Sequence, residues 1–178
     1  MKIFIAGPRA ITELDSNVRN KLFSICEKGY DVLVGDATGV DSSVQRFYAD
    51  KAYNQVTVFA GNGEARNNVG NWKVENVAVE GNRKNFDFYV QKDIAMANQA
   101  DYGFMIWNGE SKGTLNNIVN LLEQNKSCLV YLVTHLRFFS IDCEESCLKL
   151  ISLCPESAKV TYNKLTKRKA PLAQMAIF

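Results

Sequence analysis

A chain of 178 residues is long enough for one domain with a full hydrophobic core and too short for two domains of ordinary size. Lysine and arginine number 21 against 19 aspartate and glutamate, so the net charge is only +2. A dedicated nucleic-acid binder usually carries a clear basic surplus. We therefore expect any phosphate recognition to be local, and we do not expect nucleic acid as a partner.

The five cysteines form no C-x2-C pair, which counts against a zinc site or a thioredoxin-like redox site. The chain opens directly on an apolar strand pattern at residues 2–6, without the charged start and long apolar stretch of a secretory signal. It has no run of about 18 apolar residues that could span a membrane. These features predict a cytoplasmic protein with reduced thiols, no metal, no cofactor and no membrane contact.

Strand and helix patterns alternate along the first 133 residues. Apolar runs predict strands at residues 2–6, 31–34, 55–59, 101–107 and 127–133. Apolar residues at helical spacing predict helices that begin near Asp15 or Ser16, near Asp41, after residue 85 and at Thr114. This alternation predicts an α/β fold: a Rossmann-like, doubly wound, mostly parallel sheet.

Two stretches do not follow this alternation. Residues 61 to about 80 are rich in glycine and asparagine, which predicts a long loop. Beyond Thr134 the pattern changes again, with one helix expected from near Asp142 to Pro155. We therefore expect a nucleotide-binding domain at residues 1–133 and a helical C-terminal extension at residues 134–178.

Three glycine-bearing loops follow predicted strands. They are Gly7-Pro8-Arg9, residues 35–41 and residues 109–114. In doubly wound sheets, ligands bind outside the carboxyl ends of the strands. Two of the loops open a helix, where free N–H groups and the helix dipole favour an anion, and Arg9 adds a planar donor. The convergence predicts a site for an anionic small molecule.

The same residues resemble the SLOG superfamily. The resemblance rests on Gly7-Pro8-Arg9, on residues 35–41 (Gly-Asp-Ala-Thr-Gly-Val-Asp), on the helix end between Asp93 and Asp101, and on residues 107–117 (Trp-Asn-Gly-Glu-Ser-Lys-Gly-Thr-Leu-Asn-Asn). This Rossmann-like group includes the lonely guy phosphoribohydrolases and the DNA-processing protein A family. The chain is more distantly similar to nucleoside 2-deoxyribosyltransferases. The resemblance covers about residues 1–133 and implies a pocket for a nucleotide, nucleoside or nucleotide-derived molecule.

The loops and the resemblance together define a set of expected ligand-binding residues. They are Gly7, Pro8, Arg9, Gly35, Asp36, Ala37, Gly39, Asp41, Arg83, Trp107, Ser111, Gly113, Thr114 and Asn117. For Arg83 an ordinary surface arginine explains the residue equally well.

Asn117 stands at the position that decides between binding and catalysis. The resemblance implies a catalytic glutamate three residues after the threonine of the Gly-Thr pair, and this chain has an amide there. An amide neither accepts a proton readily nor acts as a good nucleophile. We therefore predict a binding protein or sensor for a nucleotide or nucleoside derivative. The alternative is an N-glycosidic hydrolase or a deoxyribosyltransferase-like enzyme that uses Asp36, Asp41 or Asp93, although helix capping also explains Asp41.

Two further expectations concern partners. The helix from Thr114 has a broad apolar face, which suggests a homodimer, although packing on the sheet explains the same leucines. The triplet Lys167-Arg168-Lys169 suggests a nucleic-acid-associated module by analogy with the DNA-processing relatives. A solvated charge run explains that triplet better, because the overall charge is balanced.

Overall fold

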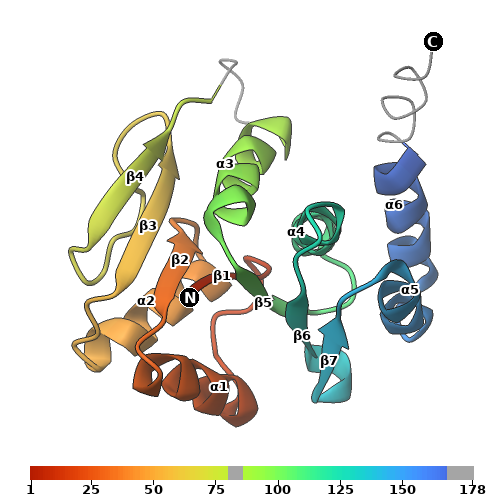
Figure 1. Ribbon diagram of the computed structural model, residues 1–178, viewed down its shortest axis with the longest axis horizontal. Coiled ribbons are helices and arrows are strands. Elements are labelled where there is room, and N and C mark those ends of the chain that lie inside the picture. Colours follow the sequence, from red (N-terminus) through yellow and green to blue (C-terminus); the bar gives the residue numbers. More distant parts are fainter. Residues whose placement is uncertain (80–85, 168–178) are drawn as a thin grey trace.

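A seven-stranded sheet runs through the centre of the protein in this computed structural model, which describes residues 1–79 and 86–167 (Figure 1). The strands are β1 (Lys2–Ala6), β2 (Asp31–Gly35), β3 (Val56–Gly61), β4 (Lys73–Val77), β5 (Tyr102–Trp107), β6 (Cys128–Leu132) and β7 (Arg137–Ile141). Their order in the sheet is β4-β3-β2-β1-β5-β6-β7. Every neighbouring pair is parallel except β6 and β7, which are antiparallel.

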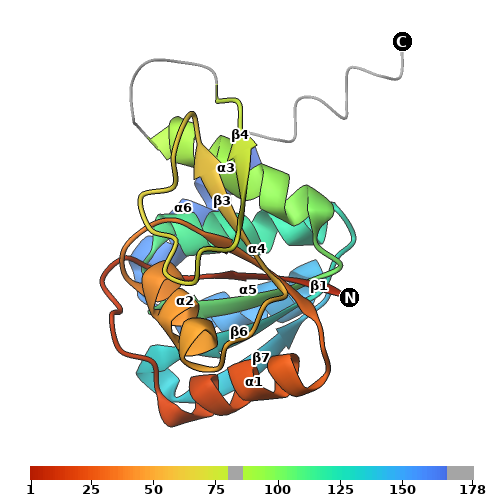
Figure 2. The ribbon, with the colours of Figure 1, turned by 90° about the vertical axis from the view of Figure 1, so that its left-hand side faces the viewer.

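Helices cover both faces of this sheet (Figures 1 and 2). They are α1 (Ser16–Glu27), α2 (Val40–Asp50), α3 (Phe86–Gln99), α4 (Lys112–Glu123), α5 (Glu144–Ser152) and α6 (Glu156–Lys167), with a short 3-10 turn η1 (Val133–His135). Successive strand residues point to opposite faces, so Ile3 and Ile5 pack toward α1 and α2. Phe4 and Ala6 pack toward α3 and α4. The predicted doubly wound α/β fold is confirmed.

The chain reverses its direction of winding beside β1. From β1 it passes outward through α1 to β2 and through α2 to β3. It then returns through α3 to β5, which pairs with the other side of β1. The gap between the connections above β1 and β5 is the topological switch point, where open α/β sheets bind ligands.

Strand β4 lies inside the stretch that the sequence predicts to be a loop. It is one of the two edge strands, with all five residues exposed or half-buried, and it is held by its pairing with β3. An exposed edge strand is held by backbone hydrogen bonds, which do not require apolar side chains. Its sequence therefore shows no apolar pattern that would predict a strand. The preceding residues are anchored by Trp72, which is 9% exposed and donates its Nε1 proton to the Tyr53 carbonyl at 2.8 Å.

The C-terminal residues add β7 to the sheet and two helices to one face. The core that lies against α3 and α4 also contains Ile141, Leu150 and Tyr162 from β7, α5 and α6. Only one of these helices was expected from the sequence. Within the two described ranges, no helix has the length and apolar character needed to cross a membrane.

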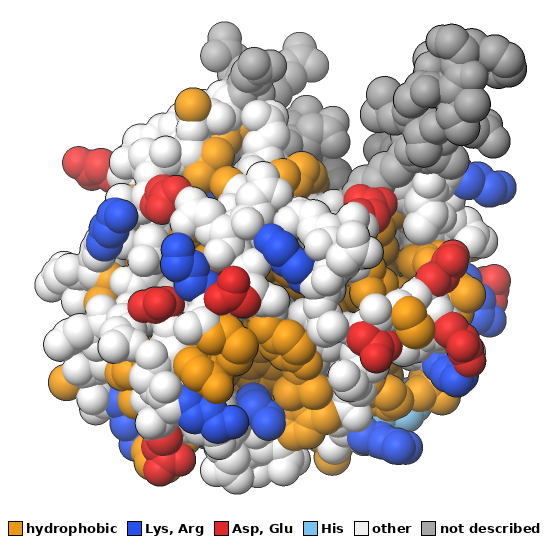
Figure 3. Space-filling view, in the orientation of Figure 1, with side chains coloured by type: hydrophobic (Ala, Val, Ile, Leu, Met, Phe, Trp, Pro, Cys, Tyr) orange, Lys and Arg blue, Asp and Glu red, His pale blue; other side chains and the backbone are white. Residues whose placement is uncertain are grey.

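A hollow ringed by hydrophobic side chains is visible on one face of the molecule (Figure 3). An apolar cavity of about 250 Å³ opens beside the amino ends of β1 and β5, with Ile3, Tyr102 and Phe104 in its wall. This cavity lies at the amino ends of the strands, so it is separate from the ligand site expected at their carboxyl ends.

Candidate functional site

The main cavity opens at the carboxyl ends of β1, β2 and β5 and has a volume of about 620 Å³. Its walls come from the loop after β1, the loop between β2 and α2, residues 89–96 of α3, Arg66 from the segment between β3 and β4, and the loop that leads from β5 into α4. The lining residues are Ala6, Gly7, Pro8, Arg9, Ala10, Ala37, Asp41, Arg66, Tyr89, Val90, Lys92, Asp93, Met96, Asn108, Glu110, Ser111, Lys112, Gly113, Thr114 and Asn117. This is the switch point of the sheet.

Most of the residues predicted to bind a ligand meet in this cavity. Those that line it are Gly7, Pro8, Arg9, Ala37, Asp41, Ser111, Gly113, Thr114 and Asn117, together with Asp93. Four others, Gly35, Asp36, Gly39 and Trp107, are absent from its wall. Arg83 lies outside the described residues.

The amino end of α4 forms one wall. The helix begins at Lys112 with Ser111 as its N-cap, two residues before the predicted start at Thr114. The Ser111 hydroxyl accepts a hydrogen bond from the Thr114 N–H at 3.4 Å and from the Thr114 hydroxyl at 3.1 Å. Trp107 is fully buried and donates to the Ser111 carbonyl, so it holds this loop from beneath. A Cβ added at Gly113 would meet no atom within 4 Å, so the backbone is open to a ligand there.

Asn117 lies one turn into α4 and is only 3% exposed. Its Oδ1 atom has no hydrogen-bond partner among the described residues, and the side chain lines the cavity. A buried acceptor without a partner costs free energy, which a ligand donor can recover. The position therefore presents an acceptor to a bound N–H or O–H group.

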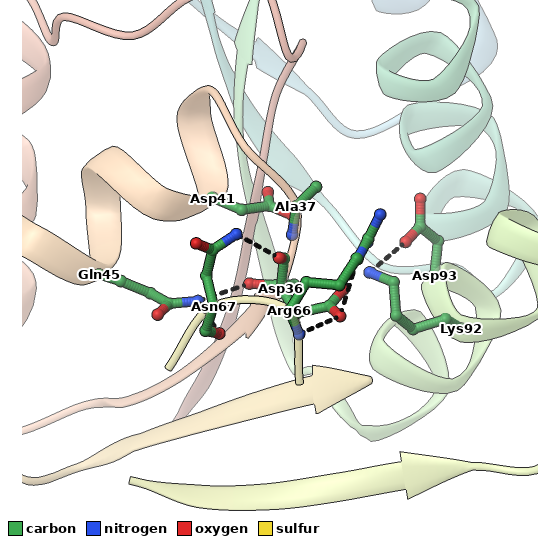
Figure 4. A network of polar contacts seen from close by, with 9 residues as sticks. Asp36, Ala37, Asp41, Gln45, Arg66, Asn67, Lys92 and Asp93 are labelled. Carbon is green, nitrogen blue, oxygen red and sulfur yellow. Dashed lines mark hydrogen bonds and ion pairs between the residues drawn. The ribbon is translucent and has the colours of Figure 1, made fainter. Parts of the chain in front are cut away.

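Asp36 is held in a two-pronged ion pair by Arg66, which comes from the segment between β3 and β4 (Figure 4). The Arg66 Nη2 and Nε atoms lie 2.6 and 3.0 Å from the two carboxylate oxygens, and the Arg66 backbone N–H donates at 3.1 Å. Burial acts to raise the pKa of Asp36, but these hydrogen bonds outweigh it and leave that pKa lowered. Asp36 faces a small side cavity of about 80 Å³.

We expect Arg66→Met to lower the free energy of unfolding by about 1–3 kcal/mol, because the Asp36 carboxylate, 4% exposed, loses its charged donor. The lower part of the usual range applies because the Arg66 side chain is 38% exposed. Urea unfolding at pH 7 measures the loss. The double variant with Asp36→Asn should recover part of it, and a neutral result for Arg66→Met would show that the pair is not stabilising.

Two amides tie the same segment to the loop after β2. Gln45 is fully buried and its Nε2 atom donates to the carbonyls of Gly35 and Asn67 at 2.9 and 3.2 Å. The Asn67 side chain donates to the Asp36 carbonyl at 2.8 Å. These bonds fix the approach of Arg66 to the site, although the segment between β3 and β4 contains no helix (Figure 4).

Lys92 is the buried cation of the site. It is 5% exposed and its Nζ lies 3.0 Å from the Asp93 carboxylate, with Asp41 and Asp36 as further negative neighbours. Burial acts to lower the pKa of Lys92, but these three carboxylates leave it raised. A Cβ on Gly35 would lie 2.6 Å from the Lys92 Nζ, so glycine at the end of β2 leaves the space that the ammonium fills.

Asp41 is not the N-cap of α2. Gly39 holds that position with a φ of 80°, and a Cβ there would lie 2.4 Å from the Arg9 backbone. Asp41 sits in the first helical turn, 7% exposed, and accepts a hydrogen bond from the Ala37 N–H at 3.2 Å. Burial raises the pKa of Asp41 to about 6, with Lys92 opposing the rise and the Asp93 and Asp36 charges adding to it. The capping interpretation of Asp41 is therefore wrong, because the close approach to Arg9 requires glycine at the cap.

Arg9 and Arg66 lie over the ring of Tyr89. Their guanidinium carbons are 4.7 and 5.2 Å from the ring centroid. Such contacts hold arginine side chains in place beside a cavity. The Arg66 Nε and Nη2 atoms are bonded to Asp36, so Arg9 is the arginine of this pair that is placed to bind an anion.

Sequence reasoning missed Arg66, Tyr89, Lys92, Asn108, Glu110 and Lys112 as residues of the cavity wall. A signal was present in α3: residues 89, 92, 93 and 96 recur at helical spacing and all line the cavity. Two of these four residues, Lys92 and Asp93, are charged, so the sequence pattern does not indicate a buried helix face. Arg66 carried no such signal, because it stands in an irregular segment.

Other candidate residues have structural surroundings. The Asp101 carboxylate accepts a hydrogen bond from the Lys2 N–H at 2.7 Å, and His135 is exposed beyond β6. Among the residues that the structure describes, no group of histidine, cysteine and acidic side chains could hold a metal ion.

The apolar face of α4 is covered within the chain. Leu115, Ile118 and Leu121 are at most 1% exposed, and the helix packs against β5, α3 and α6. The broad apolar face that suggested a homodimer is therefore accounted for by intrachain packing.

Comparison with known proteins finds similarity in structure and none in sequence. No protein-family model and no curated protein matches the chain. Among solved structures, its structure is similar to that of DNA processing protein A from Helicobacter pylori, which is described as having a unique single-stranded DNA binding mode. The TM-score is 0.58 with 11% sequence identity, covering 94% of this chain and 81% of that one. The chain thus has a Rossmann-like fold related to that of DNA processing protein A.

This similarity corrects two predictions. The expected small-molecule nucleotide or nucleoside ligand, with its enzymatic alternative, is contradicted because the similar structure is that of a single-stranded DNA-binding protein. The expectation that nucleic acid is not a partner is wrong for the same reason. Its basis was the net charge, which averages over the whole surface and does not show where individual cations lie. Arg9, Arg66, Lys92 and Lys112 line one cavity, together with Asp41, Asp93 and Glu110.

Proposed function

We propose that this protein binds single-stranded nucleic acid, with a backbone phosphate seated in the main cavity at the amino end of α4. The observation that carries the proposal is the meeting of that helix end with Arg9 in one cavity of about 620 Å³. Helix amino ends present unpaired N–H groups and a positive dipole end, and arginine adds planar donors. The fold similarity to a single-stranded DNA-binding protein supports the choice of ligand.

The chemistry of the cavity fits a single strand better than a duplex. Single-strand binders combine local cations with aromatic side chains, and here Tyr89 lies in the wall between Arg9 and Arg66. A single strand is flexible and can turn its backbone into a concave site. The backbone of a regular duplex is fixed in the double helix and cannot turn inward in this way. The Asn117 oxygen would accept a hydrogen bond from a base amino group or a sugar hydroxyl.

The three aspartates considered as catalytic replacements favour binding over bond cleavage. Asp36 is held by Arg66, Asp93 by Lys92, and Asp41 is buried beside the Ala37 N–H. Each has a structural partner, and the residue nearest to the expected catalytic position is the amide of Asn117. We therefore assign recognition to this site and no reaction.

Three finer assignments accompany this proposal. We infer membership of the SLOG superfamily from residues 35–41 and 107–117, whose loops line or support the cavity. We infer that residues 1–133 form the binding domain and that residues 134–178 are an extension of it. We also propose that Arg9, Ser111, Gly113, Thr114 and Asn117 contact the nucleic acid directly.

The test uses fluorescence anisotropy with a labelled oligo-dT single strand over a series of salt concentrations. We expect binding that weakens as salt rises, because counterions are released from the phosphates. We expect Gly113→Glu to bind about tenfold or more weakly, because a carboxylate about 4 Å from a phosphate costs on the order of 1–4 kcal/mol. An acidic residue in the first turn favours the helix, so the variant should fold.

The matched control is Gly113→Gln, which has nearly the same size and no charge. It should lose less affinity than Gly113→Glu, and circular dichroism should show both variants folded. Absence of binding by the folded wild-type protein at low salt would refute the proposed function. Equal affinities for the wild type and Gly113→Glu would show that no phosphate binds at the amino end of α4.

A further inference from the structure

Another small cavity, here called the second cavity, adjoins the main one at Lys112. It has a volume of about 140 Å³ and is lined by Lys112, Thr161, Lys164 and Leu165. Lys112 is the first residue of α4 and also lines the main cavity. The other three residues belong to α6, which packs against α4. The two cavities therefore share one lysine as a common wall.

The lining of the second cavity is suited to an anion. It contains two lysines, Thr161 and one aliphatic side chain, and none of its lining residues is acidic. The Thr161 hydroxyl donates to the Ser157 carbonyl at 2.8 Å, so the two lysines are the donors for an anion. Leu165 is 5% exposed and belongs to the main core, so α6 is anchored next to α4 and Lys164 is carried on a fixed helix. Thr161 and Lys164 are one helical turn apart and face the same side.

We propose that α6 extends the nucleic-acid binding surface. A single strand with one phosphate at the amino end of α4 passes Lys112 and places a neighbouring phosphate in the second cavity, where Lys164 contacts it. This inference rests on the proposed function and adds the path of the strand, as well as a direct role for the C-terminal extension. An acidic peptide would meet the same two lysines, and the experiment below separates the two ligands.

The test compares Lys164→Gln with Lys159→Gln in oligo-dT binding over a salt series. Both variants lose one positive charge from α6. Lys159 lines neither of these cavities and pairs with Glu156 at 2.9 Å, so it is the matched control. The slope of log affinity against log salt should become shallower by about 0.7 in Lys164→Gln, the value for one lost single-strand phosphate contact. A fourfold rise in salt then weakens the wild type about 2.6-fold more than this variant. Lys159→Gln should keep the wild-type slope.

A length series of oligo-dT strands gives an independent reading. The wild type and Lys159→Gln should gain affinity when the strand becomes long enough to reach α6, and Lys164→Gln should lack this gain. Binding by the wild type with identical slopes in both variants would overturn the path over α6 and leave the main site intact. Equal weakening in both variants would also overturn it, because it would indicate a general charge effect.

The remaining outcomes separate this inference from the proposed function. Absence of oligo-dT binding by the wild type would refute both the strand path over α6 and the proposed function. Preference for a poly-glutamate peptide over oligo-dT, lost in Lys164→Gln, would assign the second cavity to an acidic protein segment and overturn the strand path. Normal binding by Lys164→Gln together with loss in Gly113→Glu would keep the proposed function alone.

Discussion

Replacing Lys92 by methionine is expected to lower the free energy of unfolding by about 3–5 kcal/mol. Lys92 is 5% exposed and lies among Asp36, Asp41 and Asp93. Removing one member of a buried ion group leaves the remaining charges uncompensated in a medium of low dielectric constant. Methionine keeps the length and apolar stem of the side chain, so the loss reports the missing charge rather than a cavity.

Denaturant unfolding at pH 7 measures this loss directly, and thermal unfolding should show a drop in Tm of about 6–20 °C for a chain of this size. Lys149→Met is the control, because Lys149 is 75% exposed in a surface pair with Glu145 and should change stability by less than about 0.5 kcal/mol. Adding Asp41→Asn to Lys92→Met should restore part of the stability. Equal effects of the two lysine variants would show that the Lys92 ammonium is not needed to balance the buried carboxylates.

Stability of the wild-type protein is expected to fall as the pH rises from about 4 to about 6, and Asp41→Asn should remove most of that fall. Burial raises the pKa of Asp41 from 3.8 to about 6 in the folded protein. In this window the folded state holds a proton that the unfolded state has released, so stability decreases with increasing pH. Full ionisation of Asp41 then costs about 3 kcal/mol.

The measurement is the free energy of unfolding at pH 4, 5, 6, 7 and 8 for the wild type and Asp41→Asn. The asparagine Oδ1 can still accept the Ala37 N–H, so the diagnostic quantity is the difference between the two curves as the pH changes. That difference should grow in favour of the variant up to about pH 7 and then level off. Parallel curves would mean that Asp41 ionises with an ordinary pKa. The lowered pKa of Asp36 acts in the opposite sense and below pH 3.8, outside this window.

Together these two results would show that the charged groups in the cavity wall control the stability of this part of the fold. Lys92 of α3 lies near the carboxylates of Asp36, in the loop after β2, and Asp41, in α2. Arg66 joins Asp36 to the segment before β4. The cluster lies where residues 89–96 of α3 approach the carboxyl ends of β1 and β2. A strand of nucleic acid would then meet a preformed wall, which lowers the cost of ordering on binding.

Several features of this fold could be read from the sequence because they depend on local patterns. Strands β1, β2, β3, β5 and β6 are buried on both faces and therefore appear as short continuous apolar runs. Their alternation with amphipathic helices predicts the doubly wound sheet, and the rule for the carboxyl ends of such sheets correctly brought Arg9, Asp41 and Gly113 to one cavity. Strands β4 and β7 and helix α6 were missed, because half-exposed edge strands and a mostly polar helix carry a weak apolar pattern.

The chemistry of the site depended on contacts between distant parts of the chain. Asp41 has the sequence surroundings of a helix cap. In the folded protein it lies buried near Lys92 of α3, and burial raises its pKa although the Lys92 charge opposes the rise. Arg66 comes from a segment without any regular pattern and reaches Asp36 because backbone and amide hydrogen bonds fold that segment back. The balanced charge correctly describes the chain as a whole. The tertiary structure decides where the cations gather, because a local electrostatic field depends on the positions of charges in space rather than on their sum.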